Sequence, residues 1–404
     1  MTRKNLFSLV KSTSIKPSSG LARCGSCGLK KGCISPKMPP TGEGRKKILV
    51  IAECPGEEED RKGIHLIGQS GILLRKQLKK IGVDLDKDCW KTNAVLCHSP
   101  NDAPTNDQID ACKPHLIRTI NKYKPNLIIP LGLTATKSLI EWVQRGKKIE
   151  AVGKWVGYVI PAREPNTWIA PMYHPAYILR MKDDLLNKLF RRQLKAAIKK
   201  ADTKPWIIPP NYKQQVHIVG TDKAVKLLKK FQNSKAISFD YEATALKPEM
   251  NGAEIVSCSV SNDKTTIAYL WTKKTAEATK QLLRSPVPKI AANIKFEERW
   301  TREHLKTSVK NWYWDTMLAA HVIDNNPGIS SLNFQSFVFL GMETYDTHIH
   351  PYLKSSGQGR LNRIRELPIE DLLLYNGLDS LLEYKLAFKQ IEILHGKKRI
   401  LCRN

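Results

Sequence analysis

Short apolar runs alternate with amphipathic stretches along the first 200 residues. The apolar runs are typical of strands buried on both faces of a sheet, and they occupy residues 47–53, 90–97, 126–132 and 168–174. Helical periodicity predicts helices over residues 71–82, 107–123 and 134–146, and a basic helix over 182–201. Strands that alternate with helices predict a three-layer α/β/α domain with a mainly parallel sheet.

The pattern changes after residue 202. Residues 203–215 contain three prolines, which indicates a linker between domains. Strand-like runs follow at 236–244, 254–261, 265–271 and 288–296, and the remaining sequence is largely helical. Strands first and helices afterwards predict a second α/β domain with a mixed sheet. We therefore divide the chain into a domain over 1–202, a linker over 203–215 and a domain over 216–404.

The net charge of the chain indicates which class of partner it binds. Its 404 residues include 66 Lys and Arg against 38 Asp and Glu, a net charge of +28. Such a surplus favours nucleic acid as a partner, because neutralised phosphates release their condensed counterions. No apolar run approaches the roughly 18 residues that a membrane helix needs, and residues 1–20 lack the apolar core of a secretory signal. We expect a cytoplasmic protein with no membrane partner.

Nine cysteines in a chain expected in the cytosol favour metal or cluster ligation over disulfides. Cys24 and Cys27 form a C-x2-C pair. Cys97 ends a predicted strand, and Cys112 lies inside the predicted helix that follows. This spacing suits a [4Fe–4S] cluster that ties the N-terminal segment to the domain. A zinc site or unligated buried thiols remain alternatives on spacing alone. Three further cysteines are expected to pack in the interior: Cys33, Cys54 and Cys89.

Four segments of the first domain share one resemblance. They are CGSC (24–27), AECPGEEEDRKGIHLIGQSGILL (52–74), TNAVLCHSPNDAPTNDQIDACKPHL (92–116) and MYHPAYILR (172–180). In order and spacing they resemble the family 4 iron–sulfur uracil-DNA glycosylases, over about residues 20–200. The resemblance implies a [4Fe–4S] cluster whose ligands are Cys24, Cys27, Cys97 and Cys112.

The same resemblance implies three roles in uracil excision. Asn93 would read the Watson–Crick edge of a flipped uracil, because a side-chain amide both donates and accepts hydrogen bonds. His174 would stabilise the negative charge that develops on uracil O2. Glu53 would orient the water that attacks the sugar.

The loop over residues 63–68 departs from that family. It reads GIHLIG where the family has G-x-P-F-V-G, so Leu66 stands where a phenylalanine stacks on uracil and His65 replaces a proline. Ala52 also replaces a glycine. Base–aromatic stacking contributes roughly 1–3 kcal/mol, which leucine cannot supply. The first domain is therefore either a working glycosylase or a module that only binds DNA.

Acidic residues in the second domain indicate metal-dependent chemistry. Asp240 and Glu242 alternate on a predicted strand, so both carboxylates project from one face. Tyr375 and Asp379 stand four residues apart on a predicted helix and share its face. Carboxylates held this closely repel one another unless cations lie between them.

These segments, with AANIKFEERW (291–300) and residues 314–337, resemble the DEDDy exonuclease motifs of the DNA polymerase I family over about residues 230–390. The resemblance implies a ribonuclease H-like fold and two Mg²⁺ or Mn²⁺ ions held by Asp240, Glu242 and Asp379. Tyr375 would orient the attacking water. Glu297, which stands where the family more often has aspartate, would hold the second ion through water.

A glycosylase-like domain ahead of an exonuclease domain resembles the N-terminal part of certain bacteriophage DNA polymerases, although no polymerase palm or fingers follow here. The expected function is 3′→5′ DNA exonuclease activity in replication, proofreading or repair, in the host cytoplasm if the protein is viral. The expected partners are single-stranded 3′ ends of DNA, uracil-containing DNA included, and a separate DNA polymerase. The alternative is a DNA- or polymerase-binding accessory protein whose glycosylase-like domain is inactive.

Overall fold

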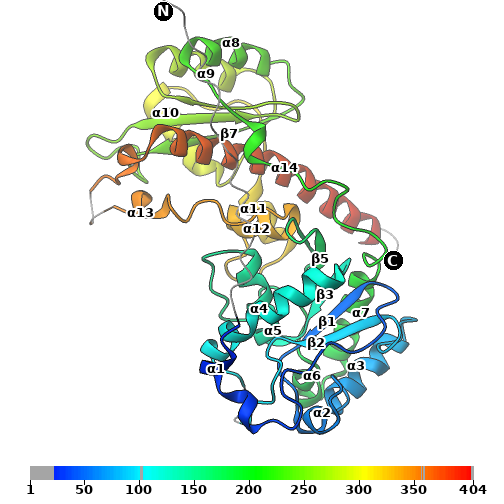
Figure 1. Cartoon of the computed structure of the whole chain (residues 1–404). Coiled ribbons are helices and arrows are strands. Elements are labelled where there is room, and N and C mark those ends of the chain that lie inside the picture. Colours follow the sequence, from blue (N-terminus) through cyan, green and yellow to red (C-terminus); the bar gives the residue numbers. More distant parts are fainter. Residues whose placement is uncertain (1–21, 101–102, 356, 358–359, 402–404) are drawn as a thin grey trace, which may run out of the picture.

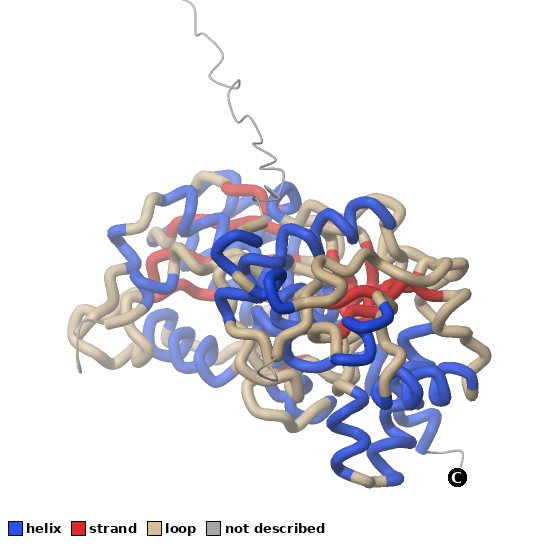
Figure 2. Tube along the Cα trace, turned by 60° about the horizontal axis from the view of Figure 1, so that its bottom comes forward, coloured by secondary structure: helices blue, strands red, loops and turns tan. Residues whose placement is uncertain are grey.

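The strands of the protein form two separate sheets, each with helices packed against it (Figures 1 and 2). This computed structural model describes residues 22–100, 103–355, 357 and 360–401. Residues 1–20, where we expect no secretory signal, lie outside the described residues. Within the described part of the chain, no helix combines the length and hydropathy that crossing a membrane requires.

The first domain is built on a five-stranded sheet with the order β2-β1-β3-β5-β4. Its strands are β1 (Ile48–Ala52), β2 (Cys89–Asn93), β3 (Leu127–Pro130), β4 (Ile160–Ala162) and β5 (Thr167–Ile169). Neighbouring strands are parallel except for β4 and β5, which confirms the predicted mainly parallel sheet. The sequence pattern missed β4 because this strand is only three residues long and contains a proline.

Helices cover both faces of this sheet, as the three-layer prediction requires. The helices of the first domain are α1 (Cys24–Cys27), α2 (Glu57–Lys62), α3 (Gln69–Lys79), α4 (Asn106–Tyr123), α5 (Gly132–Val143), α6 (Pro175–Met181) and α7 (Asp184–Ile198), and α3 to α7 pack against the sheet. Alternate residues of β1 enter different cores because successive side chains of a strand point to opposite faces. Leu49 and Ile51 share one core with residues of α4 and α5, whereas Ile48 and Val50 share the other with residues of α3 and α7.

The second domain has a six-stranded mixed sheet with the order β11-β10-β7-β8-β9-β6. Its strands are β6 (Val216–Ile218), β7 (Ile237–Ala243), β8 (Ile255–Ser261), β9 (Thr266–Leu270), β10 (Lys289–Ala291) and β11 (Trp312–Asp315). Strands β7, β8 and β9 are antiparallel neighbours, and β10 and β11 add parallel to β7. This is the predicted ribonuclease H-like arrangement. Strands β6 and β11 were not predicted.

The helices of the second domain place its acidic residues. They are α8 (Thr221–Phe231), α9 (Lys273–Arg284), α10 (Ile294–Leu305), α11 (Thr316–Ile323), α12 (Leu332–Leu340), α13 (His350–Leu353) and α14 (Ile369–Leu401). Phe239 and Tyr241 of β7 pack toward α8 and α9 in one core. The alternate residues of β7 face α14, where the Ser238 hydroxyl donates to the Ser380 carbonyl at 2.6 Å. Asp240 and Glu242 therefore point toward α14.

Helix α12 joins the two domains through apolar packing. Phe334 and Phe337 of α12 lie in the same core as Leu49 and Ile51 of β1. The Trp155 ring of the first domain lies 5.1 Å from the Phe334 ring, centroid to centroid. In Figure 1, α11 and α12 lie between the upper sheet and the lower one. Because this contact is a packed core, the domains are held in one arrangement. The division at residues 202 and 216 stays a prediction.

Candidate functional sites

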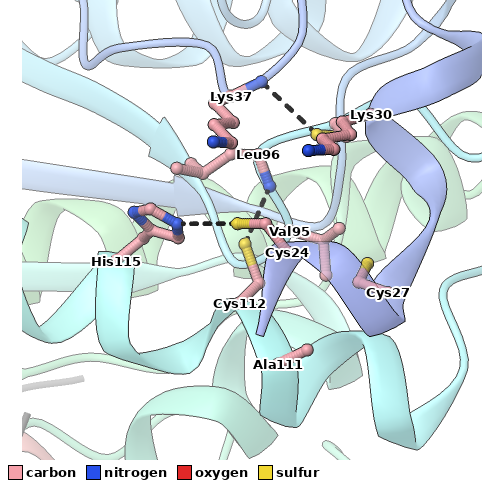
Figure 3. Close-up of a pocket in the computed structure, with 10 residues that line it drawn as sticks. Cys24, Cys27, Lys30, Lys37, Val95, Leu96, Ala111, Cys112 and His115 are labelled. Atoms are coloured by element: carbon pink, nitrogen blue, oxygen red, sulfur yellow. Dashed lines mark hydrogen bonds between the residues drawn. The ribbon is translucent and has the colours of Figure 1, made fainter. Parts of the chain in front are cut away.

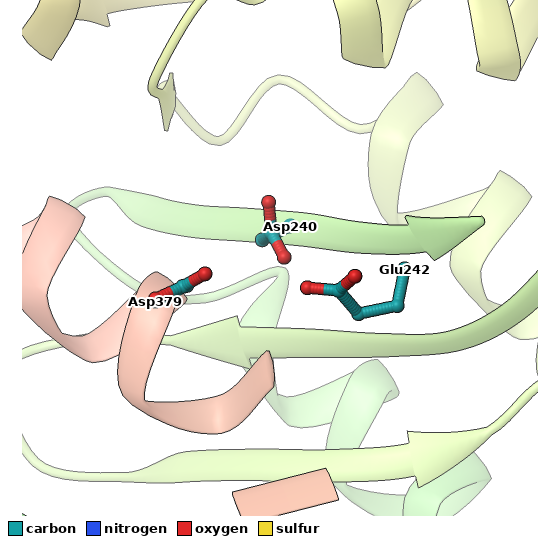
Figure 4. Close-up of side chains that lie close together, drawn as sticks. All are labelled: Asp240, Glu242 and Asp379. Carbon is teal, nitrogen blue, oxygen red and sulfur yellow. The ribbon is translucent and has the colours of Figure 1, made fainter. Parts of the chain in front are cut away.

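Three acidic side chains converge between β7 and α14. Asp240, Glu242 and Asp379 each offer a carboxylate oxygen, and these three oxygens all lie within 4.8 Å of one another. Figure 4 shows the carboxylates facing one another, two from the strand and one from the helix. Oxygen donors at this separation are the ligands that Mg²⁺ and Mn²⁺ prefer. The structure thus brings together the three residues that the sequence predicted as metal ligands.

Hydrogen bonds hold two of these carboxylates in place. The Asn376 amide donates to Asp240 Oδ2 at 2.6 Å. Asp379 Oδ1 accepts a hydrogen bond from the Tyr345 hydroxyl, and the Tyr375 hydroxyl also acts to lower the pKa of Asp379. Sequence reasoning missed Asn376, although it is adjacent to Tyr375. It also missed Tyr345, which comes from the loop after α12 and carries no local signal.

Two more glutamates are buried close to these three acidic residues. Glu297 of α10 and Glu383 of α14 are each 1% exposed, and each leaves one carboxylate oxygen without a hydrogen-bond partner. The other oxygen of Glu383 accepts from the Ala292 backbone N–H at 3.1 Å. Glu383 lies one helical turn after Asp379, so helical periodicity could have identified it. An unpartnered buried carboxylate is costly unless a proton or a cation compensates it.

Burial and mutual repulsion shift the titration of this cluster. Burial, and then the charge of Asp379, raises the pKa of Asp240 well above its ordinary value. Burial, and then the charge of Asp240, does the same to the pKa of Glu242. Burial also raises the pKa of Asp379 to about 7, even though both tyrosine hydroxyls act to lower it. Without a cation, this site therefore retains protons near neutral pH.

Two of the residues predicted to act on uracil lie at the ends of paired strands, and the third directly precedes α6. Asn93 ends β2 opposite Ala52, the last residue of β1, and Glu53 follows directly. Glu53 accepts a hydrogen bond from the Thr134 hydroxyl at the start of α5. His174 precedes α6, and a Cβ on Gly132 would lie 3.0 Å from the His174 Cβ. The carboxyl ends of parallel strands meet at one edge of the sheet, so these three residues gather there.

The protonation of His174 suits a hydrogen-bond donor. Its Nδ1 accepts from the Ala176 backbone N–H at 3.2 Å, so in the neutral ring the proton is on Nε2. Burial lowers the pKa of His174, which favours this neutral form. A neutral donor at this place can stabilise a developing oxyanion without itself requiring a counter-charge.

The altered loop contacts the predicted uracil reader directly. His65 is fully buried, and its Nε2 lies 3.0 Å from the Pro39 carbonyl oxygen, which can only accept. Its Nδ1 is therefore the acceptor for the Asn93 amide at 3.1 Å. Burial lowers the pKa of His65 to about 4, so the ring is neutral at pH 7. This hydrogen bond therefore fixes the orientation of the Asn93 amide, with Nδ2 directed at His65.

Leu66 is only 5% exposed and adopts a left-handed backbone, with φ at 57°. It packs in the same core as Leu74 and Leu78 of α3. A larger side chain at this position would have to fit a strained backbone inside a packed region. The Leu66 side chain is therefore part of the hydrophobic core against which residues 63–68 pack.

The four predicted cluster ligands line one pocket between α1, α4 and the segment after β2 (Figure 3). The Lys37 backbone N–H donates to Cys97 Sγ at 3.3 Å, and the Leu96 N–H donates to Cys112 Sγ at 3.3 Å. Such bonds support thiolate ligands.

Two residues beside this pocket were not predicted to have partners there. Cys33 was expected to pack in the interior, and its thiol lies within hydrogen-bond distance of the Leu29 and His98 carbonyl oxygens, at 3.1 and 3.6 Å. His115 Nε2 lies 3.2 Å from Cys24 Sγ, while its Nδ1 lies 2.8 Å from the Arg118 guanidinium. A guanidinium only donates, so Nδ1 is the acceptor and Nε2 carries the proton toward Cys24.

The fold and these sites define a two-domain nucleic-acid enzyme, with an α/β/α domain ahead of a ribonuclease H-like nuclease domain. A sequence model of the uracil DNA glycosylase superfamily matches residues 39–199, and one described as 3'-5' exonuclease matches residues 216–391. The chain is 34% identical to the type-4 uracil-DNA glycosylase of Pyrobaculum aerophilum over 163 residues, which are 40% of this chain and 81% of that enzyme. Through its first domain the chain belongs to the type-4 uracil-DNA glycosylase family, and its second domain makes it a hydrolase acting on nucleic acid.

Two further similarities extend the comparison. A DNA polymerase of Bacillus phage SP01 is 28% identical over 328 residues, which are 72% of this chain and 34% of that polymerase. The chain thus spans about a third of the length of this relative. The structure of Escherichia coli RNase D aligns with 45% of each chain at 13% identity and a TM-score of 0.33.

Because the pKa of Asp379 is raised to about 7, the stability of the metal-free protein should depend on pH. Folding disfavours the charged carboxylate of Asp379. The free energy of unfolding is therefore higher while Asp379 is protonated, and this contribution is lost as the pH rises through 7. Bound Mn²⁺ replaces that proton and should therefore raise the melting temperature more at pH 8 than at pH 6. The difference should be about 2–4 °C or more, the shift that 1 kcal/mol produces in a domain of this size. Melting curves of wild type and Asp379→Asn, with and without Mn²⁺, test this; an equal rise at both pH values contradicts it.

Proposed function

We propose that the second domain is a 3′→5′ DNA exonuclease that uses two divalent cations. The observation that carries this proposal is the convergence of Asp240, Glu242 and Asp379 within 4.8 Å. When bound, two cations stabilise the attacking and leaving oxygens of an in-line displacement at phosphorus. Asp240, Glu242 and Asp379 would hold them, and Glu297, buried behind these ligands, would hold the second ion through water. Tyr375, on the same face of α14 as Asp379, would orient the attacking water.

The basic surface of the first domain supports DNA as the substrate. A groove between α3, α6 and α7 is lined by Lys76, Lys80, Lys182, Lys188 and Arg191. Basic side chains along one groove bind the phosphate backbone and carry no sequence preference. We infer that this groove holds DNA, and that the protein serves replication, proofreading or repair beside a DNA polymerase in the cytoplasm.

Replacing Asp240 and Glu242 by alanine should abolish Mg²⁺-dependent digestion of single-stranded 3′ ends and leave DNA affinity nearly unchanged. The carboxylates hold the charge that stabilises the transition state, whereas basic side chains provide the affinity. Gel assays with 5′-labelled and 3′-labelled DNA measure rate and polarity, and Asp222→Ala, an exposed residue of α8, is the matched control. Digestion by the double variant above about 1% of the wild-type rate would place the metals elsewhere, since such sites contribute several kcal/mol.

We further propose that the first domain excises uracil from DNA. The specific observation is the placement of Glu53 and Asn93 at the ends of two paired strands and of His174 at the start of α6, on the same edge of the sheet. Asn93, oriented by His65, would bind the flipped base, and His174 would donate from Nε2 to the departing uracil. Glu53, held by Thr134, would orient the water. Leu66 cannot stack on the base as phenylalanine does, so slower excision than in relatives with phenylalanine is expected.

Asn93→Ala and His174→Ala should each reduce uracil release from single-stranded DNA by about 100-fold or more, as the loss of one oxyanion donor does elsewhere. Release is measured as alkali-sensitive abasic sites, and Asn121→Ala on the exposed face of α4 is the control. Binding of undamaged DNA should change little in all three variants. Absence of uracil release by wild type would instead favour the alternative, an accessory module that only binds DNA or a polymerase.

We propose that Cys24, Cys27, Cys97 and Cys112 hold a [4Fe–4S] cluster. The gathering of the four cysteines around one pocket and the backbone N–H donors to Cys97 and Cys112 support thiolate ligation there. A bound cluster would tie α1 to α4 and so fix the N-terminal segment against the domain.

Protein prepared without oxygen should be brown and contain about four iron atoms per chain, as expected for this cluster type. Cys97→Ser should lose the visible absorbance and lower the melting temperature. Cys258→Ala, a buried cysteine of the second domain, should keep the absorbance. A colourless protein that contains one zinc per chain would rule out the cluster.

A further inference from the structure

A second tyrosine reaches the proposed metal site from an unexpected direction. The Tyr345 hydroxyl donates to Asp379 Oδ1, and its ring lies 6.0 Å from that of Tyr375, centroid to centroid. Tyr345 is buried with Leu378 and Leu382 of α14, so its ring is fixed by packing. One oxygen of Asp379 is thereby engaged by Tyr345, which sets the orientation in which the carboxylate faces Asp240 and Glu242.

The segment that carries Tyr345 is docked on the first domain. We call residues 341–346 the docking segment. Gln144, at the end of α5, donates to the Met342 carbonyl at 3.4 Å and accepts from the Thr344 hydroxyl. Arg163, just after β4, pairs with Glu343 at 2.7 Å, and both side chains are largely buried. Consecutive residues of the docking segment therefore contact the first domain, and the next one contacts Asp379.

The start of the docking segment has no room to move toward the first domain. Gly341 ends α12 with φ at 66°, and a Cβ there would lie 2.0 Å from the Pro161 carbonyl oxygen of β4. The Tyr212 hydroxyl, from the linker, donates to the Leu340 carbonyl at 2.8 Å. Only glycine fits this backbone conformation and this close approach. The position of Tyr345 thus depends on contacts with both the linker and the first domain.

We propose that Tyr345 is a positioning residue of the exonuclease site, and that the first domain holds it in place through the docking segment. This rests on the proposed exonuclease function. The glycosylase-like domain would then complete the nuclease site structurally, whether or not it excises uracil. Tyr375 stays the residue that orients water, and Tyr345 acts through Asp379.

The test measures two quantities. Mn²⁺ binding is monitored by the electron paramagnetic resonance signal of the free ion, and the rate of DNA digestion is measured as a function of Mn²⁺ concentration. Tyr345→Phe keeps the ring and its packing but removes the donor. It should raise the Mn²⁺ concentration for half-saturation roughly 10-fold, the scale of a lost hydrogen bond to a charged group. The rate at saturating Mn²⁺ should fall less. The double variant Gln144→Ala, Arg163→Ala touches no carboxylate of the site and should shift half-saturation in the same direction, by about threefold.

Lys274→Ala, which breaks an exposed ion pair between α8 and α9, is the control and should leave Mn²⁺ binding unchanged. Unchanged or tighter Mn²⁺ binding by Tyr345→Phe overturns the positioning role. A shift in Tyr345→Phe without one in the double variant overturns the dependence on the first domain. Wild type that binds Mn²⁺ but digests no DNA refutes the exonuclease function instead, and the Mn²⁺ titration separates the two failures.

Discussion

The mutual repulsion of acidic side chains between β7 and α14 is the constraint on which the second domain depends. Asp240, Glu242 and Asp379 face one another, and Glu297 and Glu383 add two buried carboxyls behind them. Folding that brings such groups together is unfavourable unless protons or cations compensate the charge. The raised pKa values express that cost in the metal-free protein. A cluster of charged groups that lowers the free energy of unfolding in this way is typical of a functional site.

The surrounding structure restrains these groups instead of separating them. Asn376 donates to Asp240, and Tyr345 donates to Asp379. Glu383 accepts from the backbone N–H of Ala292, which lies between β10 and α10. Each bond fixes a carboxylate that would otherwise rotate away from its neighbours, so the site is organised before a cation arrives. Asp315 acts further out, where it accepts from the backbone of residues 293 and 294.

The two domains of the chain are physically linked through α12 and the docking segment. A shared apolar core and several polar contacts hold them together, unlike domains joined only by a flexible linker. A basic groove on the first domain and a carboxylate site in the second are therefore presented in a constant geometry. Under the proposed function, a strand of DNA bound in the groove of one domain would meet the carboxylate site of the other at a defined place.

The sequence by itself determined the fold class of both domains and most of the candidate site residues. Periodicity located the strands and helices because buried strands and amphipathic helices repeat at different intervals. The pairs Asp240 with Glu242 and Tyr375 with Asp379 followed from the same local geometry. Only the tertiary structure decided the rest. Tyr345, Gln144 and His115 act across long sequence separations, and strands of three residues such as β4 and β6 exist only because neighbours pair with them. Contacts of that kind depend on how the chain packs, which no local pattern encodes.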